Sequence, residues 1–215
     1  RRLVESGRLS SALFYGPPGT GKTAMARLVA GLSKATTVEL NAVVAGVAEL
    51  KKVLETAKFD RAAKGRRTLL LLDEIHHFNR TQQDTLLPAD ERGEVILVGL
   101  TTENPSFYVN AALLSRFTAF EFKPLTEKDL AGILDRAVSD ENLGLGAYKL
   151  SLDAQAREHL LRMSSGDARR LLNALELAAL STPPGKGGKR SITLSVAEES
   201  IQKRAIRYDK RSDDH

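Results

Sequence analysis

The sequence contains no cysteine, which excludes disulfide bonds and thiolate metal sites anywhere in its 215 residues and fits a cytosolic compartment. It also lacks any apolar run close to the roughly 18 residues that cross a bilayer, so we expect neither a membrane-spanning helix nor a membrane partner. The opening segment RRLVESGRLSSALF is basic, but its apolar part is too short for a secretory signal. No internal repeat is evident along the chain.

The remaining composition is that of an ordinary globular protein, with 42% hydrophobic and 27% charged residues. The length suits one large domain or two smaller ones. The formal net charge of +5 permits a polyanionic partner such as nucleic acid, although many equally basic proteins bind none. Charge alone therefore identifies no partner, and the motifs must indicate the function.

Five short apolar segments have the length and composition of β-strands, and helical patterns separate most of them. The most apolar, TLLLLDE, is typical of a central parallel strand covered on both faces, whereas the last segment is expected at an edge. This alternation predicts an α/β fold with a parallel sheet flanked by helices. The five segments are ALFYG (Ala12–Gly16), TVELN (Thr37–Asn41), TLLLLDE (Thr68–Glu74), EVILVGLTT (Glu94–Thr102) and AFEF (Ala119–Phe122).

Apolar spacing predicts the helices between these strands. The first follows Gly21, and the second runs from Gly46 to about Lys64, where Gly65 closes it. A third helical segment starts near Arg80, and we expect Pro88 to interrupt it because proline removes a backbone donor. The stripe of the first helix that is expected to face the core consists of Met25, Leu28, Val29 and Leu32.

The pattern changes after Pro124, where we place a boundary before a smaller, mainly helical domain. Thr126 is expected to cap the first helix of that domain, with Asp129 three residues on in a near-match to a capping box. The segment STPPGKGGKR (Ser181–Arg190) is predicted to be a flexible basic loop. Further helices are expected at Ser151–Met163, Gly166–Leu180 and Ser195–Arg207.

The segment GPPGTGKT lies between the first strand and the first helix and matches the phosphate-binding pattern G-x-x-x-x-G-K-[ST] without a gap. Its glycines allow backbone N–H groups to fold around a triphosphate, and the following helix adds its positive N-terminal end. Lys22 would reach the β- and γ-phosphates of ATP, and Thr23 would ligate Mg²⁺. A glycine-rich turn that merely joins strand to helix is the alternative, but the strand–loop–helix context favours nucleotide binding. The predicted ATP-binding residues of the loop are Gly16, Pro17, Pro18, Gly19, Thr20, Gly21, Lys22 and Thr23.

Two acids end the most apolar strand, at the sheet edge where ligands of parallel sheets bind. Asp73 would hold Mg²⁺ through its water shell, and Glu74 would orient and polarise the water that attacks the γ-phosphate. The pair could instead form a solvated turn or cap a helix. Because the phosphate-binding pattern lies about fifty residues upstream, which leaves room for the intervening β–α units, ATP hydrolysis is the better interpretation.

Four further segments together resemble the AAA+ ATPases of the clamp-loader-like branch. Within that branch they are most similar to the replication-associated recombination protein A family (also called MgsA), which includes the Werner helicase interacting protein. The resemblance covers nearly the whole chain and implies a P-loop AAA+ core with a five-stranded parallel sheet at 1–124, a helical lid at 125–207 and the start of an oligomerisation region at 208–215. The segments are DEIHHFNRTQQDTLLP (Asp73–Pro88), GLTTENPSF (Gly99–Phe107), ALLSRF (Ala112–Phe117) and SGDARRLLNALE (Ser165–Glu176).

The resemblance assigns roles to three more residues. Thr102 is the sensor 1 residue, whose hydroxyl would contact the γ-phosphate and the attacking water. Arg116 is the arginine finger, which would enter the neighbouring subunit's site and offset the charge on the transferred phosphoryl group. Arg169 is the sensor 2 arginine of the lid, favoured over the adjacent Arg170 by the spacing of the motif. From the residues alone, Thr102 could cap the next turn and Arg116 could be a surface arginine in a salt bridge.

Other positions remain open. In related ATPases a polar residue at the place of Asn41 can restrain the catalytic glutamate until DNA binds, but a strand-terminating turn is the simpler interpretation. His76 and His77 are adjacent, with no third ligand at suitable spacing, so we expect no metal site there. His77 stands where the family usually has arginine, and PADE (Pro88–Glu91) also departs from the family pattern.

The resemblance implies a DNA-dependent ATPase of replication-fork maintenance that uses ATP and Mg²⁺ at the subunit interfaces of a homo-oligomer, a tetramer in the family. Its DNA would be single-strand/double-strand junctions at stalled or gapped forks, with single-stranded DNA-binding protein and replisome components as candidate partners. It would be nucleoid-associated in a bacterium and nuclear in a eukaryote. Relatives have further residues before the first strand and after the lid, so we expect the sequence to be the core and lid of a longer chain.

Two other functions fit the same motifs. A Holliday-junction branch-migration motor shares the TT pair and an arginine finger, but it carries a winged-helix domain that nothing in the sequence indicates. A nucleotide-bound scaffold that recruits repair proteins would not need Asp73, Glu74 and Arg116 together. The sequence does not identify DNA contacts, and solvated surface charge is the alternative for each candidate. Those candidates are Arg80, Lys186 and Lys189.

Overall fold

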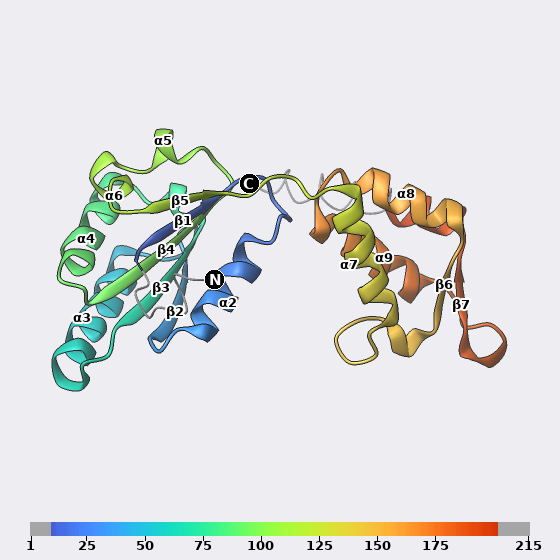
Figure 1. The fold of residues 1–215 in the computed structure, drawn as a ribbon, viewed down its shortest axis with the longest axis horizontal. Coiled ribbons are helices and arrows are strands. Elements are labelled where there is room, and N and C mark those ends of the chain that lie inside the picture. The colour runs from blue at the N-terminus through green and yellow to red at the C-terminus, as the bar shows by residue number, and fades with distance from the viewer. Residues whose placement is uncertain (1–9, 202–215) are drawn as a thin grey trace. The chain divides into compact units, whose positions relative to one another are not determined.

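The computed structural model describes residues 10–201, which form two compact units (Figure 1). The first unit contains the described residues up to Pro17 together with Gly21–Lys123, and the second contains Pro18–Thr20 together with the described residues from Pro124 onward. Apart from the three loop residues, the chain therefore divides between Lys123 and Pro124.

A five-stranded sheet forms the centre of the first unit, in the order β2–β3–β4–β1–β5, with every neighbouring pair parallel. The central strands β3 and β4 are almost wholly buried, whereas the edge strands β2 and β5 are largely exposed. The α/β fold, the central position of TLLLLDE and the edge position of AFEF are thereby confirmed. The strands are β1 (Ala12–Tyr15), β2 (Thr36–Asn41), β3 (Thr68–Asp73), β4 (Val95–Thr101) and β5 (Thr118–Glu121).

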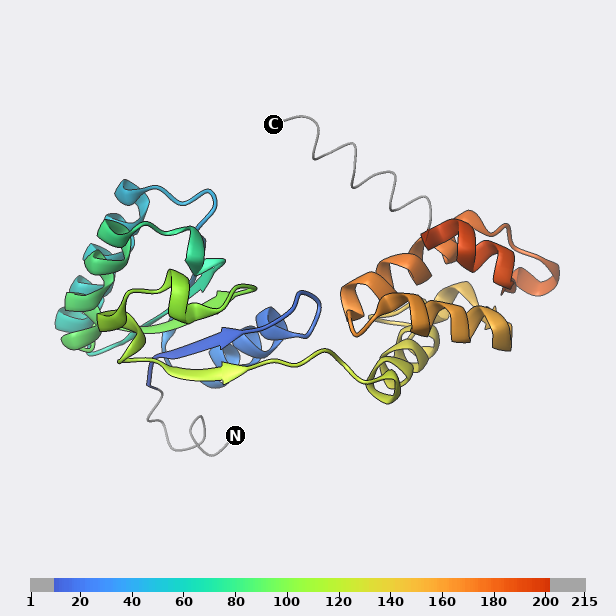
Figure 2. The same cartoon turned by 90° about the horizontal axis from the view of Figure 1, so that it is seen from above.

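Helices cover both faces of this sheet (Figure 2). Helix α2 packs on one face, and α3 and α4 pack on the other, so side chains that alternate along each strand enter two separate apolar clusters. The helices are α2 (Lys22–Leu32), α3 (Val47–Lys64), the 3-10 helix η1 (Ile75–His77), α4 (Arg80–Glu91), α5 (Pro105–Tyr108) and α6 (Ala111–Leu114).

The face of α2 that meets the sheet is not the predicted one. Ala26 and Ala30 are buried against it, while Met25, Leu28 and Leu32 are 43%, 57% and 63% exposed. Alanine lets a helix approach a sheet closely. Because consecutive helix residues point about 100° apart, the predicted stripe lies on a different side of α2 from Ala26 and Ala30. The spacing of large apolar residues therefore predicted the helix but not the side that packs.

Helix α4 continues through Pro88, contrary to the expected interruption. A capping box of Asn79 and Gln82 begins the helix, and buried residues on both sides of the proline, Leu86 and Ala89, anchor it in the core. Pro88 removes one hydrogen bond from the helix, but its carbonyl still accepts from Arg92 N at 3.1 Å. Tertiary packing outweighs the local preference here.

The second unit is mainly helical and has its own apolar core. Its first helix, α7 (Glu127–Ser139), begins with the predicted capping box, in which Thr126 Oγ1 accepts from Asp129 N at 3.2 Å and Asp129 Oδ2 accepts from Thr126 N at 3.1 Å. The other helices are α8 (Ala154–Ser164), α9 (Ala168–Ser181) and residues 194–201. Buried core residues include Leu130, Leu134, Leu160, Leu171, Leu175 and Ile192.

A two-stranded parallel sheet in this unit was not predicted. Its strands are β6 (Leu150–Leu152) and β7 (Arg190–Ile192), so the helix expected from Ser151 begins only at Ala154. Because β6 and β7 lie forty residues apart in the chain, their pairing produces no local periodic pattern in the sequence. The remainder of the predicted helix Ser195–Arg207 and the region 208–215 lie outside the described residues. Short 3-10 helices occur at η2 (Gly146–Tyr148) and η3 (Lys186–Gly188).

Within residues 10–201, no helix is both long and apolar enough to cross a membrane.

Candidate functional site

The loop between β1 and α2 has a backbone shape that only glycine adopts easily. Gly16, Gly19 and Gly21 have φ values of 138°, 69° and 93°. A Cβ atom on Gly16 would lie 2.0 Å from the carbonyl oxygen of Phe122, so a side chain does not fit there. Glycine is therefore required at position 16, where the loop leaves the carboxyl end of β1.

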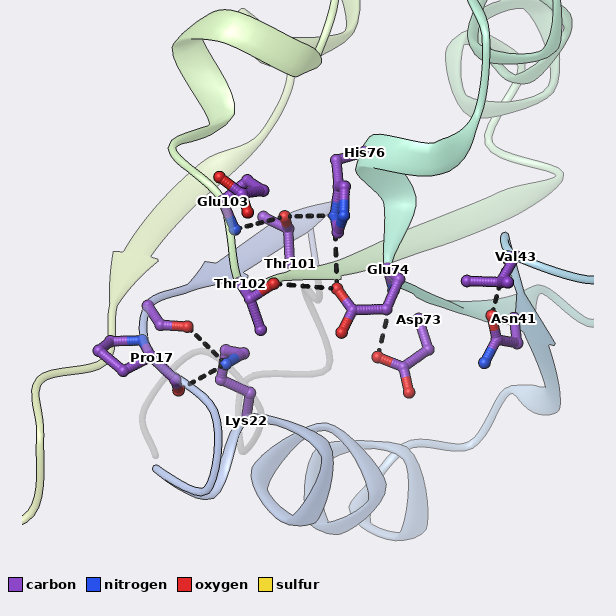
Figure 3. A network of polar contacts seen from close by, with 11 residues as sticks. Pro17, Lys22, Asn41, Val43, Asp73, Glu74, His76, Thr101, Thr102 and Glu103 are labelled. Atoms are coloured by element: carbon purple, nitrogen blue, oxygen red, sulfur yellow. Dashed lines mark hydrogen bonds and ion pairs between the residues drawn. The ribbon is translucent and has the colours of Figure 1, made fainter. Parts of the chain in front are cut away.

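Lys22 begins α2 and folds its side chain back over this loop (Figure 3). Its Nζ donates to the carbonyl oxygens of Gly16 at 2.6 Å and Pro17 at 2.8 Å, and the residue is only 8% exposed. The ammonium group is thus held at the mouth of the loop, at the positive end of a helix. A phosphate group could replace the two carbonyl oxygens as its partner, so the residues present fit a polyphosphate ligand.

The two acids lie at the end of β3, both half-buried. Asp73 Oδ1 accepts from Glu74 N at 3.2 Å. Glu74 has φ 52° and ψ 47°, a left-handed conformation that is uncommon for a residue with a side chain. It occupies the N-cap position of η1, but its side chain makes no capping hydrogen bond, so its carboxylate is directed elsewhere.

That carboxylate points to the end of the neighbouring strand β4 (Figure 3). Thr102 Oγ1 donates to Glu74 Oε2 across 3.5 Å, and His76 Nδ1 lies 3.3 Å from the same oxygen. The turn after β4 is capped by Thr101, whose Oγ1 accepts from Glu103 N at 3.0 Å. Thr102 therefore does not take the turn-capping position that the sequence left open for it.

The loop and the acids meet at one edge of the sheet because β1, β3 and β4 are adjacent and parallel. Gly16 N donates to Thr101 O at 3.3 Å and joins the loop to β4. The structure thus brings Lys22, Asp73, Glu74 and Thr102 to this edge (Figure 3). The Thr23 hydroxyl and the Asp73 carboxylate are oxygen donors of the type that Mg²⁺ prefers. Within residues 10–201, no group of three or more histidines and acids could hold a metal ion.

Arg116 is not part of this group, because it precedes β5 at the amino edge of the sheet. Its Nε donates to Asp90 Oδ2 at 2.9 Å, and Nη1 lies 3.2 Å from Glu91 Oε1. The surface salt bridge that the sequence left open is therefore present, and its acids belong to the PADE segment that departs from the family pattern. A cavity of about 490 Å³ beside it is lined by Arg116, Asp90, Arg67 and Ser115, among others.

The remaining sequence candidates occupy simpler settings. Asn41 ends β2, and its Oδ1 accepts from Val43 N at 2.9 Å, which is the strand-terminating turn. Arg169 lies exposed in the first turn of α9, in the second unit, where Asp167 Oδ1 accepts from Arg170 N at 2.9 Å.

Sequence reasoning missed two contacts. The sequence considers His76 only as a metal ligand, whereas the structure places it between Glu74 and Thr101. Asp90 was noted only as a departure from a pattern, although it holds Arg116. The contacts His76–Thr101 and Asp90–Arg116 each join residues about 25 positions apart, so no local pattern in the sequence predicts them.

The family model described as ATPase family associated with various cellular activities (AAA) matches residues 12–125, and the model described as AAA C-terminal domain matches residues 146–215. Among solved structures, the Thermotoga maritima RuvB Holliday junction branch migration motor has a TM-score of 0.69 and 22% identity, covering 94% of this chain and 64% of that one. This likeness shows a shared fold.

Curated relatives are more similar in sequence. Replication-associated recombination protein A of Bacillus subtilis is 43% identical over 214 residues, 100% of this chain and 50% of the relative. The protein of that name from Escherichia coli K12 is 40% identical over 212 residues, 99% of this chain and 47% of the relative. ATPase WRNIP1 of Dictyostelium discoideum is 42% identical over 178 residues, 83% of this chain and 20% of the relative. The chain thus spans about half the length of the first two relatives.

Proposed function

Because the chain belongs to the AAA family of ATPases, we propose that it hydrolyses ATP at the subunit interfaces of an oligomer and couples hydrolysis to DNA at stalled or gapped replication forks. One observation carries the enzymatic part of this proposal. The Glu74 carboxylate lies at the same sheet edge as the phosphate-binding loop, with its Oε2 3.5 Å from the Thr102 hydroxyl. A carboxylate in that position can act on a water beside a bound γ-phosphate.

ATP binding begins with the loop Gly16–Thr23, whose amides solvate the phosphates. Lys22 Nζ exchanges its carbonyl partners for β- and γ-phosphate oxygens. Thr23 and Asp73 are the residues that hold Mg²⁺, which supplies positive charge against the phosphate oxygens when it is bound. The adjacent amide of Glu74 already donates to Asp73, which fixes the direction of that carboxylate.

Hydrolysis requires an oriented water. Glu74 accepts a hydrogen bond from the water and takes the proton that the water releases. The water oxygen forms the new bond to the γ-phosphorus while the bond from that phosphorus to the leaving oxygen of ADP breaks. Thr102 contacts Glu74 and is placed to detect the γ-phosphate. Arg116 acts on the neighbouring subunit's nucleotide, where its charge stabilises the transferred phosphoryl group. Arg169 connects the position of the lid to the state of the nucleotide.

The DNA part of the proposal has separate support. Two relatives that match this chain over nearly all of its length are named for replication-associated recombination. The net charge of +5 favours a polyanion, and Arg80, Lys186 and Lys189 are exposed. Junctions between single- and double-stranded DNA are the proposed substrate, a homo-tetramer the proposed assembly, and single-stranded DNA-binding protein a proposed partner.

The test is ATP hydrolysis measured with forked, gapped, four-way and blunt duplex DNA at about 50 and 200 mM salt, because phosphate contacts weaken steeply over that range. We expect forked and gapped DNA to stimulate hydrolysis more than blunt duplex does, and the stimulation to fall at the higher salt. Glu74→Gln, which keeps the size of the side chain, should still bind ATP but lose hydrolysis.

Other outcomes would redirect the assignment. Strongest stimulation by four-way DNA would favour a branch-migration motor. Equal rates with and without DNA would favour a nucleotide-bound scaffold. If Glu74→Gln hydrolyses ATP as fast as the parent, Glu74 does not activate the water.

A further inference from the structure

His76 occupies a position between the two strand ends that form the proposed catalytic edge. It lies in η1, three residues after the end of β3, and its side chain is only 13% exposed. Its Nδ1 lies 2.9 Å from Thr101 Oγ1 and 3.3 Å from Glu74 Oε2 (Figure 3). Nδ1 therefore contacts both Glu74, the residue after β3, and the hydroxyl of Thr101 at the end of β4.

The ring has little freedom to move away from these partners. It lies against the His77 ring in a tilted contact, with a centroid separation of 4.3 Å, and meets Tyr108 at 5.8 Å in an edge contact. Thr101 is 1% exposed and is itself fixed, because its hydroxyl oxygen accepts from Glu103 N. The packing thus fixes the place of Nδ1.

The chemistry of the two partners decides the role of Nδ1. An ionised carboxylate only accepts hydrogen bonds, so a neighbouring ring nitrogen stabilises it only when that nitrogen carries a proton. A proton on Nδ1 is shared between Glu74 Oε2 and Thr101 Oγ1, which is the arrangement that both distances allow.

Glu74 needs such support because its carboxylate makes no capping hydrogen bond to the 3-10 helix that follows it. The residue is in a left-handed conformation between a strand and a 3-10 helix. Its contact with Thr102 is long, at 3.5 Å, and reaches the same oxygen, Oε2. Among residues 10–201, Oε1 of Glu74 accepts no hydrogen bond, so it is the oxygen that can accept from the attacking water.

We infer that His76 is a positioning residue, which anchors Oε2 of Glu74 so that Oε1 faces the attacking water. This inference rests on the proposed role of Glu74. It assigns His76 no contact with nucleotide and no transfer of a proton to substrate. Its effect should therefore appear in kcat, with little change in KM for ATP.

The test compares two substitutions of His76 with a neighbouring control in the assembled protein. His76→Leu removes the donor, and we expect kcat to fall roughly 10–100-fold, as it does when an outer hydrogen-bond partner of a reactive group is lost. His76→Asn places an amide near the position of Nδ1, and it should retain most of the activity. His77→Phe keeps a ring against His76 but removes the adjacent exposed imidazole, and it should behave as the parent.

A combination with Glu74→Gln separates this inference from the proposed function. In that background, His76→Leu should cause no further loss of the residual rate, because the residue it positions is already changed. An equal loss in both backgrounds, or a His76→Leu enzyme as active as the parent while Glu74→Gln is impaired, overturns the inference and leaves the proposed function intact. A Glu74→Gln variant with full activity overturns both. Thermal unfolding of each variant checks that the fold is retained.

Discussion

Arg116 donates from Nε to Oδ2 of Asp90 across 2.9 Å at the amino edge of the sheet. The phosphate-binding loop follows the opposite end of β1, whose four residues span about 13 Å. Because β5 follows Arg116 and runs parallel to β1, with Thr118 opposite Ala12, the arginine lies at the far end of the sheet from its own loop. This separation supports action on a neighbouring subunit rather than on the same one.

The separation predicts complementation between two inactive variants. Arg116→Ala should reduce ATP hydrolysis by about 100-fold or more, because the positive charge near the transferred phosphoryl group is lost. Mixing it with Glu74→Gln should restore part of the activity, since some interfaces then combine an intact Glu74 with an intact Arg116. The measurement is steady-state ATPase activity across mixing ratios at assembling concentrations. A mixture whose ATPase activity does not exceed the sum of the activities of the two variants alone would contradict a shared site.

Asp90→Asn is the matched control for that experiment. It weakens the ion pair but keeps the guanidinium group, and the amide oxygen that remains can still accept a hydrogen bond from Ser11 Oγ. We expect a change in rate of less than about fivefold, the equivalent of about 1 kcal/mol. A loss as large as that of Arg116→Ala would mean that Asp90 itself is essential.

Gly16→Ala should abolish nucleotide binding. The added Cβ would lie 2.0 Å from Phe122 O at a φ of 138°, so either the loop or the chain after β5 must move. The control is Gly31→Ala in α2, where a Cβ meets no atom within 4 Å and stability should rise by up to about 1 kcal/mol. Binding of a fluorescent ATP analogue and urea unfolding measure both effects. Normal binding by Gly16→Ala would show that the loop tolerates a side chain.

The capping box of α7 predicts an acid dependence of stability. Hydrogen bonds from the Thr126 side chain and backbone lower the pKa of Asp129 below its ordinary value. A carboxyl whose folded-state pKa is lowered adds stability above its unfolded-state pKa, near 4, and that contribution disappears as pH falls through the folded-state value. Asp129→Asn should therefore lower Tm at neutral pH, and the difference from the parent should shrink in acid.

Melting curves followed by circular dichroism from neutral pH to about pH 3 measure this dependence. Asp153→Asn is the control, because Asp153 occupies the N-cap position of α8 without a capping hydrogen bond from its side chain. Its Tm should follow that of the parent at every pH. A difference between Asp129→Asn and the parent that persists unchanged in acid would contradict the assigned cause.

The core of the second unit predicts a large effect of cavity formation. Leu134 in α7 is fully buried, and Leu134→Ala should destabilise that unit by about 2–5 kcal/mol through lost burial and the cavity left behind. Leu143→Ala removes the same atoms from a residue that is 94% exposed and should change stability by less than about 0.5 kcal/mol. Urea unfolding compares the two, and equal effects would contradict the assigned core.

Local chemistry made much of the fold predictable. The loop after β1, the closure of α3 at Gly65 and the capping box of Thr126 each depend on residues within a few positions of one another. For the same reason the sequence predicted the strand β3 and the acids that end it. The α/β fold and the resemblance to a family of ATPases followed from these local features and their order.

The sequence by itself therefore determined which residues turn, cap and end the elements, and which motifs lie at strand ends. Only the tertiary structure decided that α2 packs through Ala26 rather than Leu28, that Pro88 stays within a helix, and that β6 pairs with β7. It also decided that His76 meets Thr101 and that Asp90 meets Arg116. These outcomes depend on contacts between residues distant in sequence or on the shape of the surface they pack against, and neither leaves a periodic signal along the chain.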